Sequence, residues 1–489
     1  MSHFLARLVI VGGGFTGATT AVQAVRRSPF PLDVIIVEPN AELGPGLPYR
    51  GGDPDHRVNG PLQTHSIDPF DTAHIQQWAD QQGVLKNDPH AQCPTGTFIR
   101  RTDYGRYLHE SVLQFSESNE SGSSIKHLRA RAVTLQSLDQ GFLVQLQDGQ
   151  ALQADAIILA FGNPPARLPR MLEGLADPSR LLSSPLAGSE LQSFIKSLGA
   201  QAHLAVMGTS LTAADVITTV LRQAPDIQVT AFSRRGLLPH RQRPPDLNPP
   251  ALPKSWLIDR INAPIPSYLY PPEGESWTVR KLCRAMRRRI DEVVSQGHAW
   301  QQGFDEARDV VWQFWPKLSD YEKRRFIRRL RVWYDVARFR LPPQTAAALD
   351  QAVASGMLRF CAQTLKSVES TKEQGLRLHF EAKDKTITQT ADALVNCTGF
   401  DLAGEIDPES FAGNLVKRGL LIRDGTGVGF RVDQDCQVIG PTGDSMSRLR
   451  LVGPATAGVF GDSLGAMFIA VQVHRMLPSL FQTLSHRLS

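Results

Sequence analysis

Three glycines near the start of the chain have the spacing that a bound diphosphate requires. The apolar run Leu8–Val11 passes into Gly12-x-Gly14-x-x-Gly17 and then directly into a stretch with helical character. Gly12 allows a tight turn, Gly14 lets a pyrophosphate approach the backbone, and Gly17 lets the helix pack closely on the strand. The free N–H groups and the partial positive charge of the helix N-terminus favour an anion there. The spacing therefore predicts a dinucleotide-binding turn, with a glycine turn in an ordinary α/β protein as the alternative.

An acid then stands where ribose recognition needs an acceptor. Val34–Val37 is a second apolar strand, and Glu38 ends it, twenty-one positions after Gly17. In a βαβ nucleotide unit, an Asp or Glu about twenty residues further on accepts hydrogen bonds from the ribose hydroxyls. Strand, turn, helix, strand and acid together predict a complete βαβ dinucleotide unit.

A second turn of the same kind opens after the strand-like run Leu204–Met207. It reads Gly208-Thr-Ser210-Leu-Thr212-Ala213, so serine and alanine replace two of the motif's glycines. The Ser210 side chain crowds a pyrophosphate, although its hydroxyl can also donate to phosphate. The turn therefore predicts a second dinucleotide site that departs from the usual pattern.

The strand after this second turn ends in arginines rather than in an acid. Ile227–Phe232 is followed by Ser-Arg234-Arg235, at the point where the first unit has Glu38. An arginine there suits the 2′-phosphate of NADP, because a guanidinium pairs well with phosphate. We expect a nicotinamide nucleotide at this site, with NADP favoured over NAD. A basic loop after an ordinary strand is the alternative.

Length and composition limit the class of protein. At 489 residues the chain is too long for one core, so two or three domains are expected. A hydrophobic content of 42%, a charged content of 21% and a formal net charge of +5 are ordinary and do not by themselves imply nucleic acid. Five cysteines without a Cys-x-x-Cys pair argue against a disulfide framework, a zinc site and a thiol redox pair, so no metal is predicted. No apolar run approaches the ~18 residues of a membrane span, and the first strand starts too early for a cleavable signal. We therefore expect a cytoplasmic protein with no membrane contact.

The middle of the chain is rich in arginine and has helical periodicity. Over Trp277–Arg340, apolar residues follow the spacing of one helix face and arginines fill the other, as in Arg287-Arg-Arg289. Such a face is usually solvated surface, and no nucleic-acid reading motif or aromatic platform accompanies it. We therefore predict no nucleic-acid partner. The aromatic and charged residues of Trp333–Arg340 could line a pocket.

Two strand-like runs end in glycine and frame the second unit. Asp155–Gly162 and Asp392–Gly399 share this pattern, and the proline-rich segment 163–169 after the first is a candidate domain boundary. Short alternating runs between residues 132 and 146 predict an antiparallel hairpin. Near the C-terminus, Gly461-Asp462 precedes an apolar helix, where the acid could simply be a cap.

The two nucleotide turns, the strand-ending glycines and Gly461-Asp462 together resemble the two-dinucleotide-binding-domain flavoproteins. Within them the chain is similar to the FAD–NAD(P)-binding protein family, which is flavin monooxygenase-like and includes members that resemble FAD-dependent urate hydroxylases. The resemblance covers nearly the whole length. It is carried by Val9–Gly17, Val58-Asn59, Arg101-x-x-Tyr104-Gly-x-Tyr-Leu108, Met207–Thr212 and Asn396–Gly399.

The resemblance implies where two cofactors would bind. FAD would lie across Gly12–Gly17 and Glu38, with Asn59 and Arg101 near the flavin and Asp462 beside the ribityl chain. NAD(P)H would sit on Gly208–Thr212 with Arg234. The full set of implied cofactor-binding residues is Gly12, Gly14, Gly17, Glu38, Asn59, Arg101, Gly162, Gly208, Ser210, Thr212, Arg234, Gly399 and Asp462.

The implied fold is α/β, with two Rossmann-like dinucleotide-binding domains, the second inserted in the first, and a helical insertion. Residues 1–165 and 391–489 would form the FAD-binding domain, and residues 170–390 the NAD(P)-binding domain with a helical insert at 276–345. Two fingerprints of related enzymes are missing. The Phe-x-Gly-x-x-x-His of Baeyer–Villiger enzymes is absent around the linker, and the Cys-x-x-Cys of thioredoxin reductases is absent throughout.

The activity implied is that of an FAD-dependent NAD(P)H monooxygenase. A C4a-hydroperoxyflavin would pass an oxygen atom from O₂ to a small-molecule substrate, and no protein nucleophile is needed. The most specific expectation is urate to 5-hydroxyisourate, in purine metabolism, since an anionic heterocycle would suit Arg167, Arg241 and Arg338. The alternatives are a flavin reductase or oxidase without oxygen insertion, and a non-enzymatic FAD/NAD-binding protein. The sequence leaves open the oligomeric state and any catalytic acid or base, including whether His65, His240 or His474 has such a role.

Overall fold

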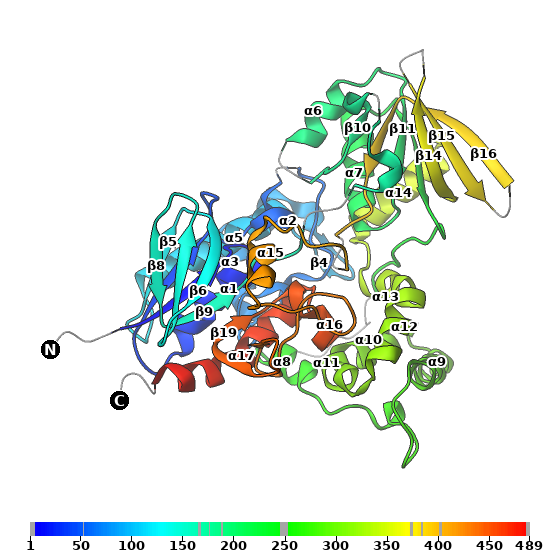
Figure 1. Cartoon of the computed structure of the whole chain (residues 1–489). Helices are drawn as coiled ribbons and strands as arrows, with labels where there is room; N and C mark the ends of the chain where they lie inside the picture. The colour runs from blue at the N-terminus through cyan, green and yellow to red at the C-terminus, as the bar shows by residue number, and fades with distance from the viewer. Residues whose placement is uncertain are drawn as a thin grey trace.

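The computed structural model describes residues 5–51, 53–164, 168–175, 177–186, 189–244, 253–371, 375–382, 385–400 and 403–485. Two parallel sheets with helices packed against them form two α/β domains, and a group of helices lies beside the first (Figure 1). This confirms the predicted α/β architecture with two dinucleotide-binding folds.

The first sheet contains the first predicted βαβ unit. Its strand order is β18-β19-β9-β1-β2-β5, and neighbouring strands are parallel except for the edge pair β18–β19. Every residue of β2 is buried, as expected for a strand inside a covered parallel sheet. The strands are β1 (Ala6–Val11), β2 (Leu32–Val37), β5 (Ser124–Leu128), β9 (Ala156–Leu159), β18 (Gln437–Ile439) and β19 (Ser445–Leu451). The main helices of this domain are α1 (Phe15–Arg27), α5 (Arg101–Glu117) and α17 (Ala466–Ser485), with α1 in contact with both others.

The predicted hairpin is confirmed and gains a third strand. β6 (Ala132–Ser137) pairs antiparallel with β7 (Phe142–Leu146), which pairs antiparallel with β8 (Ala151–Ala154). Gly149, in the loop between β7 and β8, has φ +86°, in the left-handed region that glycine adopts without strain. This small sheet connects β5 to β9 of the first sheet.

The second sheet contains the second predicted nucleotide unit. Its strand order is β10-β17-β11-β12-β13, with all neighbours parallel. Beside it, β14, β15 and β16 form a separate antiparallel sheet at the outer end of this domain (Figure 1). The strands are β10 (Leu181–Leu182), β11 (His203–Met207), β12 (Gln228–Ser233), β13 (Leu358–Ala362), β14 (Thr364–Ser370), β15 (Leu376–Ala382), β16 (Lys385–Ala391) and β17 (Ala393–Asn396). The helices are α6 (Glu190–Lys196), α7 (Leu211–Gln223) and α14 (Pro343–Ala354).

One predicted domain boundary needs correction. The division at residue 391 assigns residues 393–396 to the first domain, yet this strand, β17, lies between β10 and β11 of the second sheet. The two strand-to-glycine runs look alike in sequence, but Asp392 alone separates β17 from β16, so the chain has no length in which to cross to the other sheet. By sheet membership, the second domain therefore ends after Asn396.

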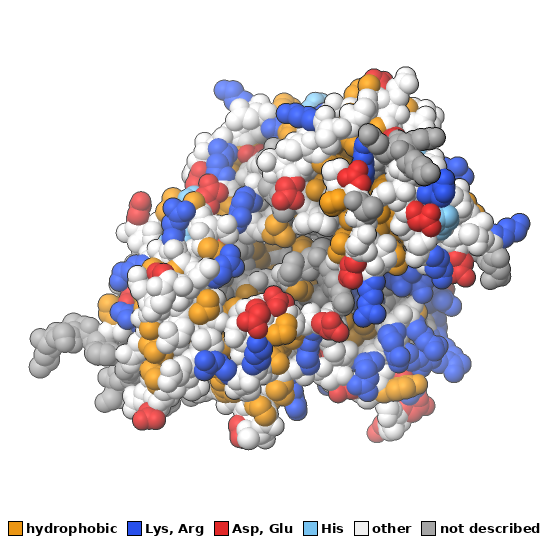
Figure 2. Space-filling view, turned by 45° about the horizontal axis from the view of Figure 1, so that its top comes forward, with side chains coloured by type: hydrophobic (Ala, Val, Ile, Leu, Met, Phe, Trp, Pro, Cys, Tyr) orange, Lys and Arg blue, Asp and Glu red, His pale blue; other side chains and the backbone are white. Residues whose placement is uncertain are grey.

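The predicted helical insert is helical but broken into short helices. Figure 1 places these helices beside the C-terminal elements of the first domain, and Trp315 Nε1 donates to the Gly458 carbonyl at 2.8 Å. The insert, which chain order assigns to the second domain, thus packs on the first. Its helices are α9 (Val279–Ser295), α10 (Trp300–Asp309), α11 (Val311–Phe314), α12 (Asp320–Arg329) and α13 (Arg331–Arg338). Many Lys and Arg side chains gather on this side of the molecule (Figure 2).

The remaining elements are short. They are α2 (Gly46–Arg50), α3 (Ala73–Gln81), α4 (Val84–Asn87), α8 (Trp256–Ile261), α15 (Phe411–Lys417), α16 (Ala457–Phe460), β3 (Gln92–Cys93), β4 (Gly96–Thr97) and seven 3₁₀ turns. Among the described residues, no helix has the length and apolarity to cross a membrane.

Candidate cofactor and substrate site

The first glycine turn is as crowded as its spacing predicts. Gly12 has φ +106°, and a Cβ built on it would lie 2.4 Å from the carbonyl oxygen of Ala160, the residue directly after β9. A Cβ on Gly17 would lie 1.9 Å from the Gly12 carbonyl oxygen. A side chain at Gly12 would therefore push the turn away from the end of β9, and one at Gly17 would force α1 away from the turn after β1.

The turn also leaves the N-terminus of α1 open to an anion. Gly14 is the N-cap residue and has no side chain to satisfy the first N–H groups, and no acid lies in the first turn of α1. Those N–H groups and the helix dipole are the means by which helix N-termini bind phosphate. The residues present therefore fit the diphosphate of a dinucleotide.

Glu38 lies beside this turn, with part of its carboxylate already engaged. One oxygen accepts from the Gly13 N–H at 2.8 Å, and the other accepts from the Asn40 N–H at 3.0 Å and from the Asn40 side-chain amide. A carboxylate can accept about four hydrogen bonds, so capacity remains for one ribose hydroxyl. Glu38 fits the predicted role and also fastens the turn to the end of β2.

The second turn has the same geometry. Gly208 has φ +126°, and a Cβ on it would lie 2.3 Å from the Cys397 carbonyl oxygen. The Thr209 hydroxyl, at 2.9 Å from Ser233 Oγ and 2.6 Å from the Leu237 carbonyl oxygen, ties the turn to the loop after β12. Ser210 is the exposed N-cap residue of α7 and makes no side-chain cap bond. Its hydroxyl is thus available to a phosphate rather than committed to the helix.

Arg234 follows β12, where the 2′-phosphate prediction needs a cation. Its side chain is exposed and has no ion-pair partner among the described residues. Gly162 and Gly399 follow β9 and β17 with φ +74° and +82°, and nothing lies within 4 Å of the Cβ position of either. Both predicted strand ends are therefore open.

Arg101 and Asp462 are both engaged in buried ion pairs. Arg101, the first residue of α5, lies with Nη2 2.8 Å from Asp215 Oδ2 on α7 of the other domain. Asp462 is buried and accepts from Arg338 Nε at 2.5 Å and from the Tyr334 hydroxyl at 3.3 Å. Each residue thus joins two parts of the chain, and the flavin contacts implied for them remain predictions.

A cavity of about 1440 Å³ lies where the two domains and the insert meet. Of the predicted site residues it brings together Asn59, Arg101 and Thr212. The Asn59 carbonyl accepts from Gln242 Nε2 at 2.8 Å, which links the first domain to the loop after β12. The lining does not include the other predicted residues: Gly12, Gly14, Gly17, Glu38, Gly162, Gly208, Ser210, Arg234, Gly399 and Asp462.

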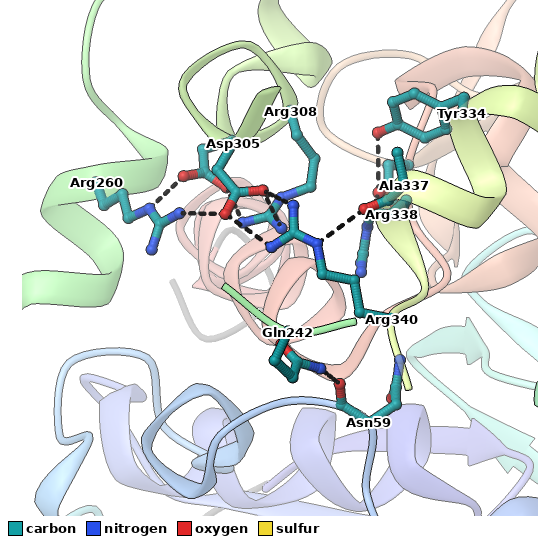
Figure 3. A network of polar contacts seen from close by, with 11 residues as sticks. Asn59, Gln242, Arg260, Asp305, Arg308, Tyr334, Ala337, Arg338 and Arg340 are labelled. Atoms are coloured by element: carbon teal, nitrogen blue, oxygen red, sulfur yellow. Dashed lines mark hydrogen bonds and ion pairs between the residues drawn. The ribbon is translucent and has the colours of Figure 1, made fainter. Parts of the chain in front are cut away.

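One wall of this cavity is a buried ion network that the motifs did not reveal (Figure 3). Asp305 of α10 lies 2.7 Å from Arg340 Nη2 and 2.9 Å from Arg308 Nη1. Burial pushes the pKa of Asp305 upward, but the charges of Arg308 and Arg340 outweigh it and hold the pKa below its usual value. The network comprises Arg260, Asp305, Arg308, Asp309 and Arg340. The i, i+3, i+4 spacing of Asp305, Arg308 and Asp309 was a local sign of it, but their partners lie far along the chain.

His65 also lines the cavity, as a neutral acceptor. Its Nδ1 lies 3.1 Å from the Pro61 carbonyl oxygen, which can only accept, so Nδ1 carries the proton. Nε2 has no hydrogen-bond partner among the described residues, and the side chain borders the cavity. Burial lowers the pKa of His65 to about 4, so the ring stays neutral near neutral pH.

Two of the three arginines expected to suit urate border different cavities. Arg338 lines the large cavity but is paired with Asp462, and Arg241 is paired with Asp350 beside a second cavity of about 1000 Å³. Arg167 lies outside the described residues. Among the described residues, no group of three or more His, Cys, Asp or Glu side chains is placed to hold a metal.

Two family models match parts of the chain. Residues 9–164 match the model described as FAD-NAD(P)-binding, and residues 93–244 match the model described as L-lysine 6-monooxygenase/L-ornithine 5-monooxygenase. The chain is an FAD-dependent, NAD(P)H-using monooxygenase. It is of the two-dinucleotide-binding-domain, flavin monooxygenase-like type, as the sequence resemblance implied. No curated protein matches it by sequence.

Solved structures have a fold similar to that of this monooxygenase over nearly its whole length. The ornithine N-hydroxylase of Kutzneria sp. 744 has 15% identity and a TM-score of 0.63, covering 99% of this chain and 100% of that one. The FAD-bound cadaverine monooxygenase of Erwinia amylovora has 14% identity and a TM-score of 0.63, with 98% and 94% covered. The L-lysine 6-monooxygenase of Pseudomonas syringae has 15% identity and a TM-score of 0.60, with 97% and 99% covered. At these identities the likeness shows the fold, and neither the family models nor these structures point to a urate hydroxylase or to purine metabolism.

Proposed function

We propose that this monooxygenase N-hydroxylates the side-chain amine of a small amino acid, using FAD, NADPH and O₂, with L-ornithine and L-lysine as the first candidates. The observation that carries the proposal is the match of residues 93–244 to the lysine/ornithine monooxygenase model. This stretch includes Arg101, the second glycine turn and Gln242, whose side chain donates to the Asn59 carbonyl. It therefore contributes to two sides of the large cavity.

The charge of the cavity favours an amino acid over a diamine as the substrate. Asp305 and Asp309 in its wall are paired with arginines, and Glu306 is paired with Arg289. Lys254, by contrast, lines the cavity and has no side-chain partner among the described residues. An excess of cations attracts a substrate carboxylate, whereas the second ammonium of a diamine would meet like charge.

The chain's own residues would bind, orient and enclose the reactants. FAD, when bound and reduced by the nicotinamide, would supply activated oxygen. Only an amine with a free lone pair can attack that oxygen, so the nitrogen must lose its extra proton before it reacts. His65 Nε2, a neutral acceptor on the cavity wall, suits a hydrogen bond from the amine N–H that would aim the lone pair. The walls contributed by both domains would keep out bulk water.

The test is turnover of purified, FAD-loaded protein with NADPH in air. NADPH loss, peroxide and hydroxylamine product would be followed with L-ornithine, L-lysine, cadaverine and urate as separate substrates. We expect hydroxylamine in step with NADPH loss for an amino acid and mostly peroxide with cadaverine or urate. If every amine gives only peroxide, the proposal fails and a reductase or oxidase becomes the better assignment.

A further inference from the structure

The basic charge of this protein is concentrated on two adjacent helices. Helices α9 and α12 together carry eleven basic and four acidic residues, a net charge of +7, whereas the whole chain carries +5. All other residues are therefore net −2. An excess of positive charge confined to one place attracts an anionic partner to that place, whereas charge spread over the whole surface mainly improves solubility.

Six arginines on these helices are free for an external partner. They are exposed and have no hydrogen-bond or ion-pair partner among the described residues. We call them the basic face: Arg280, Arg284, Arg287, Arg288, Arg328 and Arg329. The four on α9 follow i, i+4, i+7 and i+8 spacing, so they lie on one side of the helix. None of the six lines either cavity, so the basic face is separate from the substrate site.

The two helices are held together so that their arginines adjoin. The buried Glu322 of α12 accepts from the backbone N–H of Val279, the first residue of α9, at 2.7 Å. Burial raises the pKa of the Cys283 thiol, while the charges of Arg287 on α9 and Arg325 on α12 both act to lower it. Both guanidiniums therefore lie near one thiol, and the faces of the two helices meet there. Figure 2 shows a dense group of Lys and Arg side chains on this side of the molecule.

Exposed aromatic side chains accompany the basic face. The three most exposed aromatic residues of the described chain are Tyr321 at 64%, Tyr270 at 55% and Trp333 at 51%, and all three lie on or next to the insert helices. Tyrosine and tryptophan favour the headgroup region of a bilayer because one end is apolar and the other polar. Clusters of four to eight basic residues on an amphipathic helix are typical of binding to anionic lipids.

We propose that the basic face binds the anionic headgroup surface of a lipid bilayer and holds the enzyme on it peripherally. A bilayer neutralises a broad array of arginines without requiring a complementary shape, and neither cavity opens among them. An acidic protein would need an anchoring pocket, and a single-stranded nucleic acid a groove with stacking aromatics. Such membrane contact would differ from the sequence expectation of no membrane partner, and it is independent of the substrate.

The test is co-sedimentation of the FAD-loaded protein with vesicles at about 0.1 M salt, where surface charges still act over about 10 Å. One set of vesicles contains equal parts phosphatidylglycerol and phosphatidylcholine, and the other contains phosphatidylcholine alone. The variant is the triple substitution Arg284→Gln, Arg287→Gln, Arg288→Gln. The matched control is Arg129→Gln, Arg131→Gln, Arg359→Gln, which removes the same charge from exposed arginines elsewhere. Retained flavin absorbance and an unchanged unfolding midpoint verify that both variants are folded.

We expect binding to the anionic vesicles only, a more than tenfold loss in the basic-face variant, and less than twofold change in the control. Equal losses in the two variants would assign the effect to net charge and overturn the proposal. So would failure of the wild type to bind anionic vesicles. Tighter binding to a DNA duplex or to polyglutamate than to the vesicles would identify a nucleic acid or an acidic protein as the partner of the basic face. That result would reject the lipid assignment.

Discussion

Replacing Asp215 by Asn tests the ion pair that joins the two domains. The contacting side chains, Arg101 and Asp215, are 13% and 6% exposed, and their closest N–O distance is 2.8 Å. Asp215 Oδ2 makes no well-aligned hydrogen bond, so the contact is mainly charge attraction. Removing one member of a buried pair costs about 3–5 kcal/mol, because the other charge stays buried. Arg101 also borders the large cavity and donates to the Arg57 carbonyl, so we expect the lower figure of about 2–3 kcal/mol.

The assay is a double-mutant cycle with Arg101→Met and Asp215→Asn. Denaturant unfolding of the FAD-loaded protein would be followed by flavin fluorescence, and the coupling energy is expected to be about 2 kcal/mol. The control cycle is Lys366→Met with Glu381→Gln, an ion pair on β14 and β15 whose side chains are 56% and 53% exposed. Its coupling should stay below about 1 kcal/mol. An Arg101–Asp215 coupling no larger than this control would refute the account of the interface.

Four further predictions concern the cofactors and the cavity. Gly12→Ala places a Cβ 2.4 Å from a carbonyl oxygen, so the protein should purify without flavin, as its absorbance would show. Arg234→Gln should raise KM for NADPH about tenfold, the equivalent of about 1.4 kcal/mol, and leave KM for NADH unchanged in steady-state assays. Lys254→Met should raise KM for the amino acid about tenfold and leave cadaverine-dependent NADPH oxidation unchanged. His65 is buried and neutral with a pKa of about 4, so its protonation lowers the free energy of unfolding as pH falls from 6.5 toward 4. His65→Gln should remove up to about 3 kcal/mol of this pH-dependent loss, measured by urea unfolding at each pH.

Each of these has a result that would contradict it. Full flavin content in the Gly12 variant would mean that the turn can widen, and equal changes for NADPH and NADH would place Arg234 away from the 2′-phosphate. A parallel loss with cadaverine would mean that Lys254 acts on the fold rather than on a carboxylate. An unchanged pH dependence in the His65 variant would mean that the ring is protonated in the folded protein.

The turns could be predicted from sequence because their constraints are local. Gly17 packs against the Gly12 carbonyl within one strand–turn–helix unit, so a few neighbouring residues determine that geometry. Glu38 was predictable for the same reason, since it ends the next strand. The carbonyls of Ala160 and Cys397, which crowd Gly12 and Gly208, come from distant segments that the motif does not include. The ion network around Asp305 was not, because Arg260 and Arg340 come from segments more than thirty residues away on either side. Arg101 was expected near the flavin, but no sequence pattern could show that its guanidinium also meets Asp215 on the other domain.

Helix α7 connects the predicted nicotinamide site to the loop of residues 53–59 in the first domain. Its first turn carries Ser210 and Thr212 of the predicted nucleotide site, and its Asp215, Thr219 and Arg222 follow at i, i+4 and i+7 spacing. Asp215 pairs with Arg101, and Thr219 donates to Asp53 at 2.8 Å and lies 3.0 Å from His56 Nε2. The same loop continues into Asn59 at the cavity wall.

Any rotation of the second domain that admits or releases the nicotinamide must move α7 and therefore break these buried contacts together. Asp53, His56, Asp215 and Thr219 are all buried, so opening would expose several polar groups at once and would be cooperative. A nucleotide bound at the predicted site would add contacts to the N-terminal end of this same helix. It should therefore hold the second domain against the loop of residues 53–59 more firmly than the interface does alone, and the Asp215→Asn substitution should weaken that effect.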